Sequence, residues 1–347
     1  MIHTTYENVH NQFKLNGFHL DKEDLCRVAY SFIKEGEDFE KPVGDFLLDW
    51  FDNKSYIEMQ TSGSTGAPKI VKVDKQAMVN SALATGDFFD LHPGNRALQC
   101  LPVKYVAGKM MLIRSIILGL DLDYVAPSSH PMKGLVEKYD FVAMVPMQSQ
   151  NSLKELQNVK KLIVGGARIS AALEKELMKL PTQVYETYGM TETITHIAAK
   201  RVGEKMFTVL PNVTISYDNR KCLVIYAPNI IADEKVITND LVEIINENQF
   251  KFLGRIDNVI NSGGIKIIPE QVEQKLEGKI DRRFFITSKE DLELGEKAVL
   301  VIEGDDIEID TTIFDVLDKY EHPREIIFVP KFKETENGKF LRDASLE

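Results

Sequence analysis

The spacing of apolar and polar residues changes several times along the chain. Near the N-terminus, apolar residues recur with helical spacing and predict helices over 24–34 and around 43–51. Short apolar runs at 56–59 and 70–73 predict two strands, and the spacing over 75–89 predicts another helix. The nine residues between the two strands are polar, so they form a connection with little to bury.

The middle of the chain alternates two kinds of segment. Strand-like runs lie at 97–101, 121–125, 141–145 and 161–164, and helix-like runs lie at 131–138, 153–156 and 171–180. This alternation predicts an α/β fold with a largely parallel sheet. Short runs separated by Asn, Asp and Gly turns then predict an antiparallel subdomain over 202–252, with strands at 214–217, 222–226, 241–245 and 250–253. The last third predicts a compact α+β domain, with strands at 284–287, 298–302 and 326–329 and a helix at 311–320.

Composition narrows the classes of protein. The 347 residues suit two domains, and a net charge of −11 argues against a general nucleic-acid or anionic-membrane surface. Cys26, Cys100 and Cys222 lack metal-binding spacing, which favours a reducing cytosol and a cytoplasmic protein. The most apolar stretch, 110–120, is short and contains Arg114, so we expect neither secretion nor a membrane span.

The polar connection at 61–69 reads T-S-G-S-T-G-A-P-K. Its hydroxyls, glycines and lysine suit a loop that grips polyphosphate, because glycine lets the backbone approach closely and hydroxyls add donors. The sequence Pro68-Lys69 and the strand that follows exclude a Walker loop, which opens a helix. The alternative is a plain Ser/Gly hairpin. The candidate phosphate-binding residues are Thr61, Ser62, Gly63, Ser64, Thr65, Gly66 and Lys69.

A second string, Y-E-T-Y-G-M-T-E-T, occupies 185–193. The ring of Tyr188 can stack on a base, the hydroxyl of Thr191 can hold a phosphate, and the carboxylate of Glu192 can bind Mg²⁺. Taken singly, a core tyrosine and a surface acid would explain these residues as well. The order of the two strings favours the functional interpretation.

These strings resemble the phosphate loop and the Y-G-x-T-E signature of the adenylate-forming family. Three further strings agree in order: T-N-D at 238–240 for T-G-D, G-R-I-D-N-V-I-N-S-G-G at 254–264, and T-E-N-G-K-F-L-R at 335–342. The exchange of Gly for Asn at 239 is mild, since both residues tolerate left-handed backbone. The resemblance covers 56–347, and the segment before the loop is shorter than in relatives.

The resemblance implies a fold and a domain organisation. A large N-terminal domain, 1–254, would combine mixed α/β subdomains with a small β subdomain. A hinge at 255–258 would lead to a small mobile α+β domain, 259–347. Asp257 would be the hinge residue, whose backbone rotation changes the face that the small domain turns toward the active site.

The resemblance also assigns roles to residues. It implies catalytic roles for Lys339, Thr191 and Glu192, with magnesium held by Glu192. ATP would contact the 61–69 loop together with Gly165, Gly166, Ala167, Tyr188, Gly189, Asp240 and Arg255. Coenzyme A would pass close to Ser262, Gly263 and Gly264.

The segment L-P-V-K-Y-V-A-G-K-M-M-L-I-R, 101–114, would form a wall of the acyl pocket with Tyr105, Gly108, Lys109 and Arg114. Lys109 could equally be a solvated cation. Arg114 is the better candidate, because apolar residues surround it and an unpaired cation there would be costly. His196 could line the pocket, but we favour a histidine with its hydrogen bonds satisfied. Within the family, this segment, the string at 254–264 and the short chain together are most similar to the o-succinylbenzoate-CoA ligases of menaquinone biosynthesis.

The resemblance therefore implies an ATP-dependent acid–CoA ligase that uses Mg²⁺ and coenzyme A and acts through an acyl-adenylate. Its partners would be small molecules, a carboxylic acid among them, rather than nucleic acid, and a homodimer stays open. Two alternatives remain: a ligase for another aryl or acyl acid, and an adenylate-binding module without catalysis.

Overall fold

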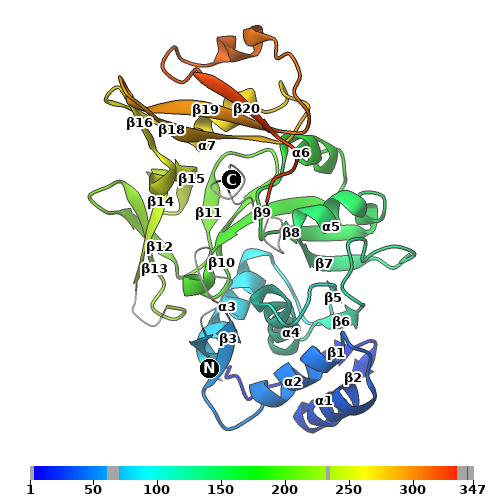
Figure 1. The fold of residues 1–347 in the computed structure, drawn as a ribbon. Helices are drawn as coiled ribbons and strands as arrows, with labels where there is room; N and C mark the ends of the chain where they lie inside the picture. Colours follow the sequence, from blue (N-terminus) through cyan, green and yellow to red (C-terminus); the bar gives the residue numbers. More distant parts are fainter. Residues whose placement is uncertain (1–3, 61–69, 232–234, 334–341, 343–347) are drawn as a thin grey trace. The chain divides into compact units, whose positions relative to one another are not determined.

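The structure is a computed structural model that describes residues 4–60, 70–231, 235–333 and 342. The chain divides into two compact units (Figure 1). The first comprises Met1–Ile169, Leu173–Thr214 and Tyr226–Val236, and the second Ser170–Ala172, Ile215–Ile225 and Ile237–Glu347. No helix in the described residues is long and apolar enough to cross a membrane.

The helices and strands have the following bounds. The helices are α1 (Lys22–Glu35), α2 (Lys41–Trp50), α3 (Lys75–Phe88), α4 (Val106–Leu118), α5 (Pro146–Asn151), η1 (Glu155–Asn158), α6 (Ala171–Leu177), η2 (Thr191–Thr193), η3 (Ile256–Asn258), α7 (Pro269–Leu276) and η4 (Thr311–Val316), where η denotes a 3₁₀ helix. The strands of the first unit are β1 (Lys14–Leu15), β2 (Phe18–His19), β3 (Tyr56–Gln60), β4 (Ile70–Asp74), β5 (Arg96–Gln99), β6 (Asp121–Tyr124), β7 (Tyr139–Met144), β8 (Val159–Val164), β9 (Gln183–Gly189), β10 (His196–Arg201) and β11 (Phe207–Val209). The remaining strands are β12 (Thr214–Tyr217), β13 (Cys222–Tyr226), β14 (Lys235–Asn246), β15 (Gln249–Arg255), β16 (Ile260–Ser262), β17 (Ile265–Ile267), β18 (Phe284–Asp291), β19 (Gly295–Glu303) and β20 (Glu325–Val329).

The first unit is built on a sheet with the strand order β11-β10-β9-β8-β7-β5-β6-β1-β2. The pairs from β9 through β8, β7, β5 and β6 to β1 are parallel, whereas β10 runs antiparallel to both β9 and β11. The predicted α/β fold with a largely parallel sheet is therefore confirmed. Parallel strands of this kind need helices on both faces of the sheet.

Alternating residues of the strands divide this core into two halves. Val142 and Leu162 belong to a cluster that includes Leu173 and Leu177 of α6. Phe141, next to Val142 in β7, points to the opposite face, where its ring lies 5.7 Å from that of Phe89 at the end of α3. Helices thus cover both faces of the central strands.

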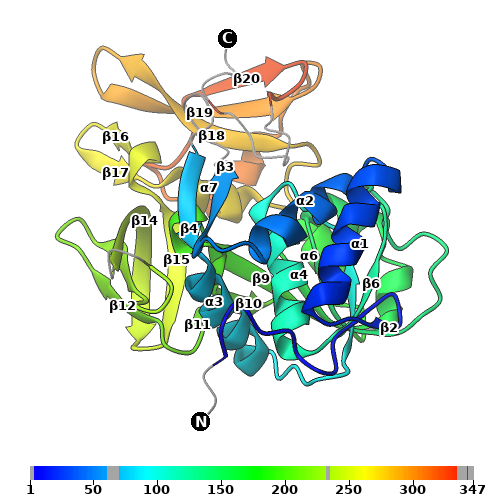
Figure 2. The ribbon, with the colours of Figure 1, turned by 90° about the horizontal axis from the view of Figure 1, so that it is seen from below.

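The strands predicted on either side of the polar connection are present and pair with each other. In β3 and β4 the antiparallel register runs from Tyr56–Asp74 to Gln60–Ile70 (Figure 2). The 61–69 segment between these two strands lies outside the described residues. A strand rather than a helix follows it, which agrees with the exclusion of a Walker loop.

The predicted helices near the N-terminus are confirmed as α1 and α2, which lie side by side (Figures 1 and 2). Three helical predictions between strands need correction. Residues 131–138 form no helix, because Pro131 opens a turn and Gly134 has φ +82°. The helix predicted at 153–156 is the 3₁₀ helix η1, and the one at 171–180 ends at Leu177.

The second unit contains two groups of strands. The first has the order β12-β13-β14-β15, with β14 and β15 antiparallel, as predicted for this subdomain. The second has the order β17-β16-β19-β18, with β20 added in parallel to β19, and it packs against α7 and η4 through Val272, Leu276 and Phe314. The predicted α+β composition is confirmed, but the helix expected at 311–320 is only the 3₁₀ helix η4, ending at Val316.

Candidate active site

The two strand-end motifs of the first unit lie at one edge of the parallel sheet. β8 ends at Val164, directly before Gly165, and β9 ends at Gly189; the two strands are parallel neighbours (Figure 1). Their carboxyl ends therefore point to the same edge, which is where ligands bind in open α/β sheets. The structure brings the G-G-A tripeptide and the Y-G-M-T-E string together at this edge.

Three glycines at this edge expose backbone that no side chain of their own covers. A Cβ on Gly165 would lie 2.5 Å from Oγ1 of Thr187, and a Cβ on Gly189 would collide with the backbone of Thr195. Gly166 is exposed and has φ +86°, a conformation that favours glycine. A planar base could thus lie close to the backbone at these positions.

The polar groups of the Y-G-M-T-E string lie on a short turn that the hydroxyl of Thr193 holds by two hydrogen bonds. Oγ1 of Thr193 accepts from the amide of Met190 at 3.0 Å and lies 2.8 Å from the carbonyl of Thr195. Thr191 is half-buried and Glu192 is exposed. Tyr188 is half-buried, and its ring lies 5.8 Å from that of Phe207.

A strained turn follows directly. Ile194 has φ 65° and ψ −56°, and the amide of Thr195 donates to the carbonyl of Thr193 at 2.7 Å. This is the γ-turn of positive φ, which is rare and costly for a β-branched residue. The turn leads the chain to Thr195 and His196, whose side chains lie beside Arg114.

Arg114 of α4 is a buried cation. Its Nη2 donates to Oγ1 of Thr195 at 3.2 Å and lies 3.4 Å from Nδ1 of His196, while its Nε is buried without a hydrogen-bond partner. In the described part of the chain, no carboxylate pairs with its guanidinium. Burial lowers the pKa of Arg114 to about 9, so it keeps its charge at neutral pH.

His196 connects Arg114 to α3. A guanidinium can only donate, so Nδ1 of His196 must be the unprotonated nitrogen, and Nε2–H donates to Oγ1 of Thr85 at 3.4 Å. The hydroxyl of Thr85 donates in turn to the carbonyl of Ser81 at 2.9 Å. Burial, and then the charge of Arg114, hold the pKa of His196 well below its usual value. The histidine is therefore neutral and hydrogen-bonded on both nitrogens, as we favoured from the sequence.

The other predicted pocket residues lie at the N-terminal end of α4. Tyr105 is its N-cap residue, and a Cβ on Gly108 would collide with the carbonyl of Pro102. Lys109 donates to the carbonyl of Val103 at 2.7 Å, and its Nζ lies 5.3 Å from the centroid of the Phe46 ring. Burial lowers the pKa of Lys109. Lys109 thus closes the loop before α4, whereas Arg114 contacts the 190–196 segment.

The second unit holds the predicted ribose and hinge residues in one polar network. Nη1 of Arg255 lies 3.3 Å from the carboxylate of Asp240, and Nη2 donates to Asp257 at 2.7 Å. Asp240 is 5% exposed and belongs to β14, opposite Arg255 of β15. The hydrogen bond from Arg255 and then that from Asn239 lower the pKa of Asp257.

The predicted coenzyme A segment is a tight turn of the second unit. Ser262 pairs with Ile265 across β16 and β17, and Gly263 and Gly264 between them have φ +57° and +82°. Two consecutive positive φ values are those of a two-residue hairpin loop, which glycine adopts without strain. No side chain projects from the tip of this turn.

Two parts of the predicted site lie outside the described residues: the 61–69 loop and Lys339. In the described part, no three His, Cys, Asp or Glu side chains gather to hold a metal. Magnesium needs only one or two carboxylates when phosphate oxygens complete its shell, so Glu192 still fits the role.

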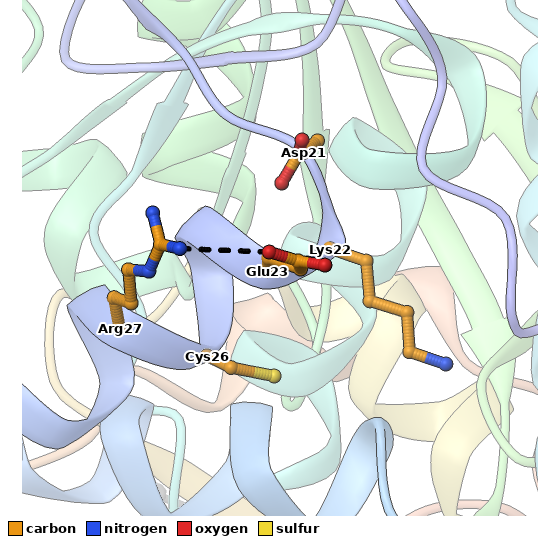
Figure 3. Close-up of a pocket in the computed structure, with 5 residues that line it drawn as sticks. All are labelled: Asp21, Lys22, Glu23, Cys26 and Arg27. Carbon is orange, nitrogen blue, oxygen red and sulfur yellow. Dashed lines mark hydrogen bonds and ion pairs between the residues drawn. The ribbon is translucent and has the colours of Figure 1, made fainter.

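A shallow hollow elsewhere on the surface contains none of the predicted residues. It lies over the first turns of α1, where Arg27 pairs with Glu23 at 3.5 Å (Figure 3). Asp21 caps this helix, and Lys22 and Cys26 complete the lining. An exposed ion pair one helical turn apart explains these side chains without a ligand.

Sequence reasoning missed three residues that contact the candidate site: Thr85, Thr195 and Asn239. Thr85 and His196 are 111 positions apart, so no local pattern connects them. Asn239 was seen only as a mild exchange in T-N-D. Its departure from the family pattern was the available signal.

Comparisons with known proteins show which family the chain is similar to. The family model described as AMP-binding enzyme matches residues 52–219. A crystal structure described as an acyl-CoA synthetase (AMP-forming)/AMP-acid ligase II-like protein from Dyadobacter fermentans is 36% identical, with a TM-score of 0.63 over 92% of this chain and 97% of that one. O-succinylbenzoate coenzyme A synthetase (MenE) from Bacillus subtilis, in complex with ATP and magnesium ion, is 20% identical, with a TM-score of 0.73 over 84% of this chain and 69% of that one, which shows a shared fold.

Two curated relatives are 2-succinylbenzoate–CoA ligases. The protein from Haemophilus influenzae is 27% identical over 70% of this chain, and that from Salmonella typhimurium is 26% identical over 86%. The matched regions span 58% and 70% of the lengths of these two relatives.

Proposed function

The chain belongs to the family of AMP-binding enzymes, and from this premise we propose that it is an AMP-forming acid–CoA ligase. In the first half-reaction, a carboxylate oxygen attacks the α-phosphorus of ATP and pyrophosphate leaves. In the second, the thiolate of coenzyme A attacks the carbonyl carbon of the acyl-adenylate, which gives a thioester and AMP. The neighbour solved with ATP and magnesium supports these co-substrates.

The residues of the chain would mainly position the reactants and stabilise charge, as phosphoryl chemistry requires. Tyr188 would stack on adenine against the bare backbone of Gly165 and Gly189, and Asp240 would accept from the ribose hydroxyls. Thr191 would hold the α-phosphate. Bound magnesium would neutralise phosphate charge beside Glu192. The 61–69 loop would hold the departing pyrophosphate, and Lys339 would bridge the attacking carboxylate and the α-phosphate.

One observation carries the choice of substrate: Arg114 is buried, charged and without a carboxylate partner in the described residues. An uncompensated buried cation is expensive, so a ligand that supplies a carboxylate would repay it. We propose o-succinylbenzoate as the acid, with Arg114 paired to the carboxylate that does not react. The names of the curated relatives support this substrate.

The test is carboxylate-dependent exchange between ATP and labelled pyrophosphate, with o-succinylbenzoate, benzoate and fatty acids compared. We expect exchange with o-succinylbenzoate and AMP as the nucleotide product once coenzyme A is added. Exchange with another acid alone would favour the alternative ligase. Binding of ATP without exchange for any acid would favour the non-catalytic module, and formation of ADP would refute the proposal.

Arg114→Met is expected to lower kcat/KM for o-succinylbenzoate by about 10- to 100-fold, because a charged hydrogen-bonding partner is lost. The value for a mono-acid of similar size, such as 4-phenyl-4-oxobutanoate, should change little, because that acid has no second carboxylate. The ratio of the two kcat/KM values is the measurement. An equal loss for both acids would show that Arg114 acts on the fold and not on the substrate.

A further inference from the structure

Asn239 stands where the resembling sequences have glycine, and its side chain lies against the predicted hinge residue. Its Nδ2 donates to both carboxylate oxygens of Asp257, at 3.0 and 3.2 Å. Its Oδ1 accepts from Nη1 of Arg220 at 2.9 Å. A glycine at this position would make neither contact.

The orientation of the Asn239 amide follows from its partners. A guanidinium only donates and an ionised carboxylate only accepts, so the amide oxygen must face Arg220 and the amide nitrogen must face Asp257. Arg220 is itself fixed by Asp218 at 2.7 Å and by the carbonyl of Thr238 at 3.0 Å. Arg220 therefore fixes the side-chain amide of Asn239 with its nitrogen toward Asp257.

The carboxylate of Asp257 thus accepts hydrogen bonds from residues of two strands. Arg255 at the end of β15 donates to it at 2.7 Å, and Asn239 of β14 donates from the other side. β14 and β15 are neighbouring strands (Figure 2). In their register, Asp240 lies opposite Arg255. Rotation about φ of Asp257 would move its carboxylate away from Asn239 and break these bonds, because Asn239 lies on the strand pair and not on the segment that follows the hinge.

We propose that Asn239 is a positioning residue that holds Asp257 in the conformation seen here, and so sets the balance between the two half-reactions. This inference rests on the proposed function, in which a backbone rotation at Asp257 separates adenylate formation from thioester formation. A group that stabilises one of two conformations must disfavour the other to the same extent. The loss of Asn239 therefore changes the two half-reactions in opposite directions.

The decisive experiment measures the two half-reactions separately in Asn239→Gly and Asn239→Ala. Adenylate formation is followed by ATP–pyrophosphate exchange, and thioester formation by coenzyme A-dependent consumption of supplied acyl-adenylate. We expect the ratio of the two rates to change about three- to tenfold, in the same direction in both variants. This is the effect expected from the loss of one half-exposed, charge-assisted hydrogen bond. The alanine variant controls for the added backbone freedom of glycine.

A double-mutant cycle assigns the effect to the contact. In an Asp257→Asn background, Asn239→Ala should leave the ratio nearly unchanged, because the charged acceptor is already gone. An equal slowing of both half-reactions, or an effect as large in the Asp257→Asn background as in the wild type, would overturn the proposal.

A second measurement does not depend on activity. The carboxyl carbon of Asp257 can be titrated by ¹³C NMR in the wild type and in Asn239→Ala. Loss of the amide donor should raise the pKa of Asp257. If the wild type activates no acid but this pKa rises, the ligase proposal fails and the contact stands. An unchanged pKa refutes the contact itself.

Discussion

Lys339→Ala is expected to lower the rate of adenylate formation by about 10²–10³-fold, while conversion of supplied acyl-adenylate to thioester changes little. The ammonium group would stabilise the charge that builds up between the carboxylate and the α-phosphate. Removal of one such preorganised donor from a transition state typically costs about 3–4 kcal/mol. The thioester step has no pentavalent phosphorus, so it has no need of this lysine.

The measurement is ATP–pyrophosphate exchange beside the rate of thioester formation from supplied adenylate. Lys331→Ala is the matched control, since Lys331 is an exposed lysine eight positions away with no role in the proposed chemistry. It should leave both rates unchanged. If Lys339→Ala slows both half-reactions equally, the lysine is not specific to the first step and the assignment of separate conformations to the two steps is wrong.

Local patterns in the sequence were sufficient for the parts of the fold that depend on neighbours in the chain. The strands at 56–59 and 70–73, the helix before Phe89 and the parallel strands of the core all follow from short-range hydrophobic periodicity. The prediction failed where periodicity conflicted with backbone preference. Residues 131–138 have helical spacing, but Pro131 and Gly134 favour a turn. At 311–320, the helix is a short 3₁₀ turn capped by Asp310.

The candidate site shows the same division. Tyr188, Thr191 and Gly165 could be predicted as candidates from the sequence, because they lie in short strings whose chemistry is local. The environment of Arg114 could be predicted only in part, because its apolar neighbours in the sequence indicated burial but did not indicate the partners Thr195 and His196. Those partners approach through a strained turn at Ile194 and a strand order that no short-range pattern encodes.

Arg342→Met is expected to lower the free energy of unfolding by about 3–5 kcal/mol at neutral pH, because it would leave a buried carboxylate without its cation. Arg342 makes a two-pronged contact with Glu273 of α7, at 2.7 and 3.0 Å, and donates to the carbonyl of Ile286 at 2.6 Å. The Glu273 side chain is only 12% exposed. Its second supporting bond comes from the amide of Ile286 at 2.8 Å.

The pH dependence of this loss separates charge from packing. Burial already raises the pKa of Glu273 above the ordinary value of 4.5, against the effect of Arg342. A raised pKa stabilises the fold below that ordinary value, and the stabilisation is lost as the pH rises through the folded-state pKa. Without Arg342 the pKa should rise further, so the deficit measured by urea denaturation should be small near pH 4.5 and grow toward pH 7. Glu273→Gln in the Arg342→Met background should restore most of the stability at pH 7, because the uncompensated charge is gone. If it restores none, the loss stems from the packing of Arg342 over the ring of Phe285, whose centroid lies 5.6 Å from the guanidinium.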